Sequence, residues 1–64
     1  MSPSATDLDE LDLEISVTYI ALGGARRVYS RSPNADNERR VEQAGAEVDR
    51  LLDQRLAARA ALAA

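Results

Sequence analysis

The 64-residue sequence contains no cysteine, histidine or lysine. Without cysteine the chain cannot form a disulfide, and without cysteine or histidine it lacks the ligands of a structural zinc site. The same absences leave no Ser–His or Cys–His nucleophile pair, no imidazole base and no lysine for a Schiff base. We therefore predict that the protein is not an enzyme and that it binds no cofactor or metal.

Aromatic residues are almost absent as well, because the chain has two tyrosines and neither phenylalanine nor tryptophan. This leaves little apolar bulk to enclose a catalytic pair of carboxylates. A chain this short buries only about 60% of its unfolded surface, and small proteins compensate with disulfides, metals or oligomerisation. Oligomerisation is the remaining device, so we predict a homo-oligomer, specifically a dimer.

Long hydrophobic runs are also missing, since no stretch approaches the roughly 18 apolar residues of a membrane helix. The N-terminal region carries acidic residues where a secretory signal needs basic ones. We predict a cytoplasmic protein with no membrane partner.

The one polar turn cluster in the chain is Ser32-Pro33-Asn34. A residue before proline is pushed out of the helical region, which ends any helix arriving from the N-terminal side. Residues 1–5 show no periodicity, and we predict that they form a disordered leader. Residues 6–64 form a single helical-hairpin domain in this prediction, with helix 6–31, turn 32–34 and helix 35–63.

The second half of the chain has the pattern of an amphipathic helix, with Asn34 or Asp36 able to cap its start. Gly45 lies inside this helix, where glycine is unfavourable by about 1 kcal/mol relative to alanine. Its presence indicates either that another backbone approaches the helix closely at this point or that the helix simply tolerates the glycine. Apolar or small residues recur at spacings of three and four, at Val41, Ala44, Gly45, Val48, Leu51, Leu52, Leu56, Ala58 and Leu62.

The first half fits two structures. Residues 11–19 alternate apolar and polar as a half-buried strand does, and Gly23-Gly24 could turn a hairpin, which gives a ββα fold as the alternative. In that register the return strand is too polar, because Ile15 faces Ser32 and Val17 faces Ser30. Read as a helix, the segment has a heptad-spaced stripe broken only by Thr18, formed by Leu8, Leu11, Ile15, Leu22, Ala25 and Tyr29.

The order of charges supports an antiparallel pair of helices. Folding the chain about Pro33 brings Asp7, Asp9 and Asp12 beside Arg55 and Arg59. Arg26 and Arg27 are then matched with Glu38 and Glu42. The predicted fold class is therefore all-α, an antiparallel two-helix hairpin that dimerises into a four-helix bundle.

The dimer prediction rests on a second apolar stripe, roughly opposite the first if residues 6–31 are helical. One partner helix cannot bury both stripes, and an exposed apolar patch signals association. We predict that this stripe is a dimer interface or a partner interface, and a different protein could dock on it helix in groove. If the segment is a strand, the stripe does not exist. Its residues are Leu13, Val17, Ile20, Ala21, Gly24 and Val28.

The only basic cluster flanks the turn and could contact an anion or nucleic-acid phosphates. Acidic residues are interleaved with it, the net charge is −3, and no aromatic stacking surface accompanies it. We therefore expect a solvated tip held by salt bridges and keep a nucleic-acid-associated or transcription-modulating protein as an alternative. The cluster consists of Arg26, Arg27, Arg31, Arg39 and Arg40.

An acidic run opens the first half, at Asp7, Asp9, Glu10, Asp12 and Glu14. Acidic residues favour the positive end of a helix dipole, and this explains the run structurally. A second explanation is an acidic inhibitor that binds a basic surface of a cellular protein.

The segment from Ala25 through Tyr29 and Ser32-Pro33-Asn34 into Val-Glu-Gln-Ala-Gly-Ala-Glu-Val-Asp-Arg-Leu-Leu (41–52) resembles small, uncharacterised Ala- and Arg-rich helical-hairpin proteins of actinobacteria and their phages. The resemblance implies a helical hairpin and no particular activity or site residues. Our functional prediction is a non-catalytic, homodimeric protein-interaction module, of the kind that serves as a phage-type accessory or regulatory protein.

Overall fold

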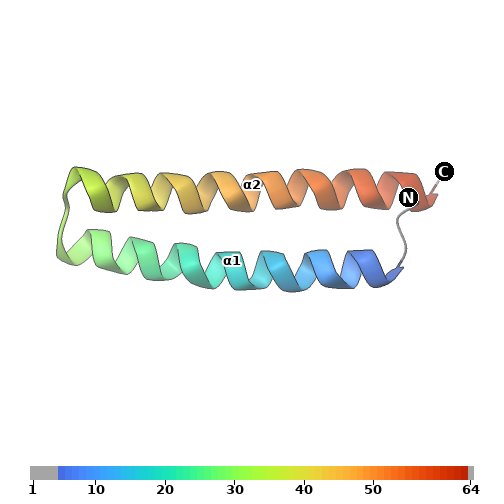
Figure 1. Ribbon diagram of the computed structural model, residues 1–64, viewed down its shortest axis with the longest axis horizontal. Coiled ribbons are helices and arrows are strands. Elements are labelled where there is room, and N and C mark those ends of the chain that lie inside the picture. Colours follow the sequence, from blue (N-terminus) through green and yellow to red (C-terminus); the bar gives the residue numbers. More distant parts are fainter. Residues whose placement is uncertain (1–4, 64) are drawn as a thin grey trace.

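The computed structural model describes residues 5–63 and consists of two long antiparallel helices (Figure 1). Helix α1 runs from Ala5–Arg31 and helix α2 from Ala35–Ala63, joined by a turn over residues 32–34. The rod measures 46 × 15 × 15 Å. The predicted all-α helical hairpin is confirmed, and the ββα alternative is wrong, because no strand occurs between residues 5 and 63.

The hydroxyl residues Ser16 and Thr18 are accommodated inside helix α1. The Thr18 hydroxyl donates a hydrogen bond to the Glu14 carbonyl at 2.8 Å, and the Ser16 hydroxyl donates to the Asp12 carbonyl at 3.0 Å. Such bonds to the preceding turn let Ser and Thr remain helical. Gly23 and Gly24 also lie within α1, and no glycine of the described chain has a positive φ.

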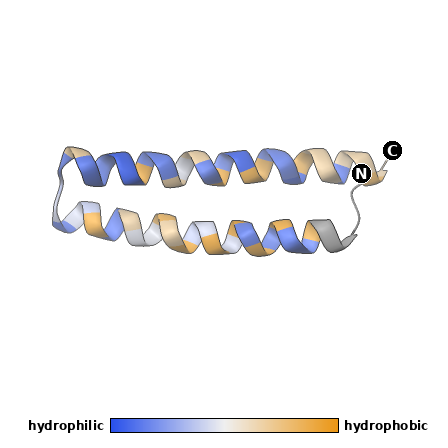
Figure 2. Cartoon of the chain, in the orientation of Figure 1, coloured by the Kyte–Doolittle hydropathy of each residue, from blue (hydrophilic) through white to orange (hydrophobic). Residues whose placement is uncertain are grey.

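The heptad-spaced stripe of α1 faces α2. Its members are buried or half-buried, including Thr18, which the apolar pattern had marked as a break. Among the side chains that the structure describes, four apolar ones are deeply buried, two from each helix: Ile15, Leu22, Val48 and Leu51 are 8%, 5%, 4% and 2% exposed. Figure 2 shows hydrophobic residues recurring along α1, whereas the half of α2 next to the turn is mostly hydrophilic.

The packed face of α2 is narrower than the sequence predicted. Leu52, Leu56 and Leu62 were assigned to it, but they are 40%, 71% and 45% exposed. A single neighbouring helix covers one seam, and in α2 that seam passes through Val48 and Leu51. Leu52 and Leu56 lie beside the seam because one residue corresponds to a rotation of about 100° around the helix.

Close approach of another backbone at Gly45 does not occur within the chain. A Cβ atom added there would meet nothing within 4 Å, and the same is true at Gly24. Gly45 is therefore simply tolerated in the hairpin, which was the second of the two explanations that the sequence allowed.

The turn is held by two asparagines that act on opposite helix ends. The Asn34 side-chain Oδ1 accepts a hydrogen bond from the Asn37 backbone N–H at 2.8 Å, which caps the start of α2 as predicted. Asn37 is buried, and its Nδ2 donates to the Ser32 carbonyl at 2.8 Å. Backbone bonds from Ser32 to Val28 and from Glu38 to Asn34, both 2.9 Å, complete the two helix ends.

Most of the predicted leader, residues 1–5, lies outside the described residues. Ala5 is the exception, because it belongs to α1.

We predict that Asn34→Ala lowers the free energy of unfolding by about 1 kcal/mol, because the Asn37 N–H loses its capping acceptor. Asn34→Asp retains an acceptor at the same position and should change stability far less. Urea unfolding followed by circular dichroism, at one fixed protein concentration, measures both variants. Equal stability of Asn34→Ala and the parent chain would contradict the capping role.

Candidate interaction surface

The second apolar stripe of α1 lies on the side of the helix turned away from α2, and we call it the outer face. Of its larger side chains, Leu13 is 66% exposed, Val17 57%, Ile20 73% and Val28 43%. The small residues Ala21 and Gly24, exposed and half-exposed respectively, lie between them. The structure thus places all six predicted interface residues on one exposed surface. Its role as an interface remains a prediction.

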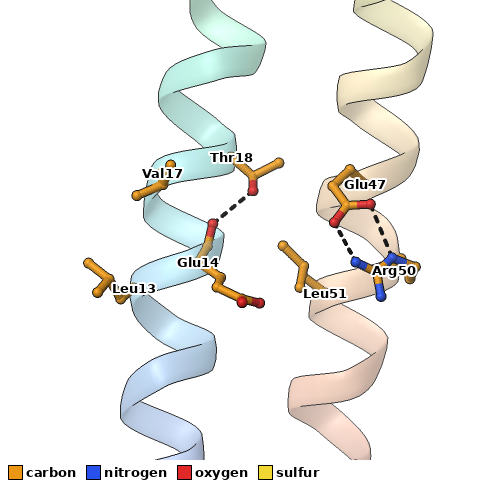
Figure 3. Close-up of a pocket in the computed structure, with 7 residues that line it drawn as sticks. All are labelled: Leu13, Glu14, Val17, Thr18, Glu47, Arg50 and Leu51. Carbon is orange, nitrogen blue, oxygen red and sulfur yellow. Dashed lines mark hydrogen bonds and ion pairs between the residues drawn. The ribbon is translucent and has the colours of Figure 1, made fainter.

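The outer face points away from α2 because its residues occupy different heptad positions from those of the stripe that packs against α2. The packed residues of α1 repeat at spacings of three and four, and so do the outer residues, rotated by more than a third of a turn. One helix therefore presents two apolar surfaces, and only one of them contacts α2. Figure 3 shows Leu13 and Val17 projecting from α1 away from α2, while Leu51 of α2 points toward α1.

An open pocket of about 420 Å³ adjoins the outer face on the groove between the helices (Figure 3). One wall comes from α1 and includes Leu13 and Val17, so the pocket and the outer face share an apolar rim. The other wall comes from α2. The lining residues are Leu13, Glu14, Val17, Thr18, Glu47, Arg50 and Leu51.

The polar wall of this pocket is an ion pair within α2. Arg50 contacts the Glu47 carboxylate through both its Nε, at 3.1 Å, and its Nη2. The hydrogen bond from Arg50 lowers the pKa of Glu47, and the positive charge of Arg50 adds to this effect. The same contacts raise the pKa of Arg50, and the negative charge of nearby Glu14 contributes. Both side chains remain substantially exposed, so the pair is a weak contributor to stability.

A second ion pair joins the two helices. Arg55 Nε of α2 lies 2.5 Å from Asp12 Oδ1 of α1. The order of charges in the sequence predicted that Asp12 and Arg55 lie next to each other. The matching pairs expected at the turn end are absent, because no ion pair within 4 Å involves Arg26 or Arg27 in the described part of the chain.

The five arginines of the predicted basic tip are all exposed and flank the turn. The structure brings them to one end of the rod, as expected for a hairpin (Figure 1). The tip is solvated as expected, but the expected salt bridges are wrong for the described residues, whose two ion pairs lie elsewhere. Of the acidic run, Asp9, Glu10, Asp12 and Glu14 are exposed near the opposite end.

Sequence reasoning missed the exposure of several apolar side chains outside the outer face. Leu52 and Leu56 of α2 are 40% and 71% exposed, and Tyr19 of α1 is 50% exposed. The spacing of four between the two leucines is a helical-face signal, but it does not reveal whether that face is covered.

Among residues 5–63, no group of His, Cys, Asp and Glu side chains is arranged to hold a metal ion. Neither helix, over its described length, is long and apolar enough to cross a bilayer. Comparisons of the chain with protein-family models, curated proteins and solved structures found no match.

We predict that Arg50→Gln raises the pKa of Glu47 toward its ordinary value of about 4.5. A lowered carboxyl pKa stabilises the fold above the unfolded-state pKa, and this contribution is lost as the pH falls through the folded-state pKa. The variant should therefore lose part of the acid-side pH dependence of stability. NMR titration of the Glu47 carboxyl carbon measures the shift.

Arg55→Gln serves as the control, because Arg55 pairs with Asp12 and does not contact Glu47. It should leave the Glu47 titration unchanged. An identical Glu47 titration in Arg50→Gln and the parent chain would show that the ion pair does not form in solution.

Proposed function

We propose that this chain is a non-catalytic interaction module that forms a homodimer through the outer face of α1. The single observation that carries the proposal is the exposure of Leu13, Val17, Ile20 and Val28 on one contiguous side of a helix. Patches of this kind on small proteins mark association sites. Two hairpins joined through this face make a four-helix bundle with the two α1 helices at its centre.

The small core supports the same conclusion. The described residues include four deeply buried apolar side chains, which are few for a protein that has neither a disulfide nor histidine or cysteine ligands for zinc. Covering the outer face would bury about as many apolar side chains as the hairpin buries internally. Association then supplies stability that the monomer lacks.

The same surface also explains why we favour a binding role over catalysis. The pocket beside the outer face is open, and its polar lining consists of Glu14, Thr18 and the exposed Glu47–Arg50 ion pair. Catalytic groups work best in a concave site that excludes water. The sequence offers no histidine, cysteine or lysine to act there.

The basic tip is the strongest feature for the alternative of nucleic-acid contact, since its five arginines are exposed and not used in ion pairs of the described chain. The overall charge of −3 opposes binding to phosphate, and Tyr29, the aromatic residue nearest the tip, is half-buried. The acidic-inhibitor alternative rests on a run that helix-dipole energetics already explain. The outer face therefore supports the better proposal.

We predict that Ile20→Glu dissociates the dimer, because it places a charge in the centre of the apolar contact. Leu56→Glu is the matched control: Leu56 is 71% exposed against 73% for Ile20, but it lies on α2, away from the outer face. Sedimentation velocity should show the parent chain and Leu56→Glu as dimers and Ile20→Glu as a monomer. Circular dichroism checks that the variants keep their helices.

The proposal would be contradicted by an Ile20→Glu variant that sediments as a dimer with the affinity of the parent chain. Loss of the dimer in Leu56→Glu alone would move the interface to α2.

A further inference from the structure

We infer that the second copy docks antiparallel on the outer face, with the two-fold axis passing between Ile20 and Ala21. This register rests on the proposed function, because it specifies how the dimer is built. A two-fold contact is isologous, so a residue away from the axis meets a different residue of the other copy, and the pairing is reciprocal. The sequence of the outer face has the symmetry that such a contact requires.

The six apolar residues are arranged symmetrically about the midpoint between Ile20 and Ala21. Leu13 lies as far before this point as Val28 lies after it, and Val17 and Gly24 are related in the same way. In an antiparallel pair of helices, residues equidistant from the axis come opposite each other. The contact therefore sets Leu13 against Val28, Val17 against Gly24, and Ile20 against Ala21 of the second copy.

Large side chains face small ones at the middle of this contact. Val17 meets a glycine, and Ile20 meets an alanine. A Cβ atom added at Gly24 would find nothing within 4 Å in the hairpin, so nothing inside the chain requires a glycine there. Facing a large side chain with a small one lets two helices approach closely and interdigitate.

Charged residues near the two ends of the outer face are also arranged symmetrically about the midpoint between Ile20 and Ala21. Glu10 and Glu14 lie on its N-terminal side, and Arg27 and Arg31 lie on its C-terminal side, each exposed. The antiparallel register brings Glu10 level with Arg31 and Glu14 level with Arg27 of the second copy. None of the four takes part in an ion pair of the described hairpin, although the charge of Glu14 also acts on Arg50 of α2 across the groove.

Other arrangements of the second copy lose this complementarity. A parallel contact places glutamates beside glutamates and arginines beside arginines, which is unfavourable. Sliding the antiparallel copy by one heptad sets Val17 against Arg31 in one direction and Gly24 against Glu10 in the other. Only the register centred between Ile20 and Ala21 pairs each of the six outer-face residues with another of the six and brings both glutamates level with an arginine.

The absence of native cysteine permits a direct test of this register with single-thiol variants. We expect no disulfide in Leu13→Cys alone or in Val28→Cys alone, because identical positions lie about 22 Å apart along the helix axis. Disulfides need Cα atoms within about 7 Å. Mixing the two variants under mild oxidation should give a cross-linked heterodimer, since position 13 then faces position 28.

The possible outcomes separate the register from the dimer itself. A disulfide within either single variant would indicate a parallel contact and overturn the register. A mixture that does not cross-link, although the parent chain sediments as a dimer, would also overturn it and leave the proposed function standing. A parent chain that sediments as a monomer would contradict both the register and the proposed dimer.

Charge reversal provides an independent measurement that leaves the apolar contact intact. Arg27→Glu with Arg31→Glu turns all four end contacts into like-charge pairs, and we expect the dimer dissociation constant to rise roughly tenfold or more at low salt. Adding Glu10→Arg and Glu14→Arg restores opposite charges at every contact and should recover the parent affinity. Analytical ultracentrifugation of the three chains tests this, with circular dichroism reporting helix content.

An unchanged affinity in the Arg27→Glu, Arg31→Glu chain would overturn the inferred charge pairing. So would a fourfold variant that keeps its helices but remains as weakly associated as the twofold variant.

Discussion

Helix α1 has apolar side chains on two of its faces, and α2 can cover only one of them. This mismatch governs the rest of the structure. The covered face contains Ile15 and Leu22 and provides half of the buried core, whereas the outer face leaves Ile20 73% exposed. Neither of the two described helices covers it, and in the proposed dimer a second copy of the chain supplies the missing contact. The proposed dimer and its register are consequences of this constraint.

The turn and the charges support the alignment in which the packed stripe of α1, and not the outer face, contacts α2. Asn34 caps α2, and Asn37 fixes the end of α1 through the Ser32 carbonyl, so the chain reverses at a defined point. The Asp12–Arg55 ion pair links the helices far from the turn. Together these contacts favour one alignment of α2 on α1. Individually such exposed polar contacts are weak, and their value lies in specifying geometry.

Much of this fold could be predicted from the sequence, because the heptad stripe from Leu8 to Tyr29 and the Ser32-Pro33-Asn34 turn are strong signals. The choice between helix and strand for residues 11–19 was harder, since both periodicities occur there, and packing against α2 decides it. The exposure of Leu52 and Leu56 could not be predicted, because several adjacent helical faces of α2 are apolar or small. Which face packs depends on the partner helix.

The outer face itself was predictable as a stripe, but its exposure follows only from the arrangement of both helices. The Asn37 bond to Ser32 depends on the conformation of the chain reversal and has no comparable sequence signal. The unpaired arginines at the tip also departed from expectation, since alternating charges in a sequence do not ensure contact in space. These differences all concern long, exposed side chains or tertiary alignment, which local patterns describe poorly.

Sedimentation equilibrium of the unmodified chain over a range of concentrations tests the central claim most directly. The claim predicts a mass that rises with concentration to twice the 6.9 kDa of the single chain and stays there. A mass that remains at 6.9 kDa at every concentration, with the helices intact by circular dichroism, would contradict it.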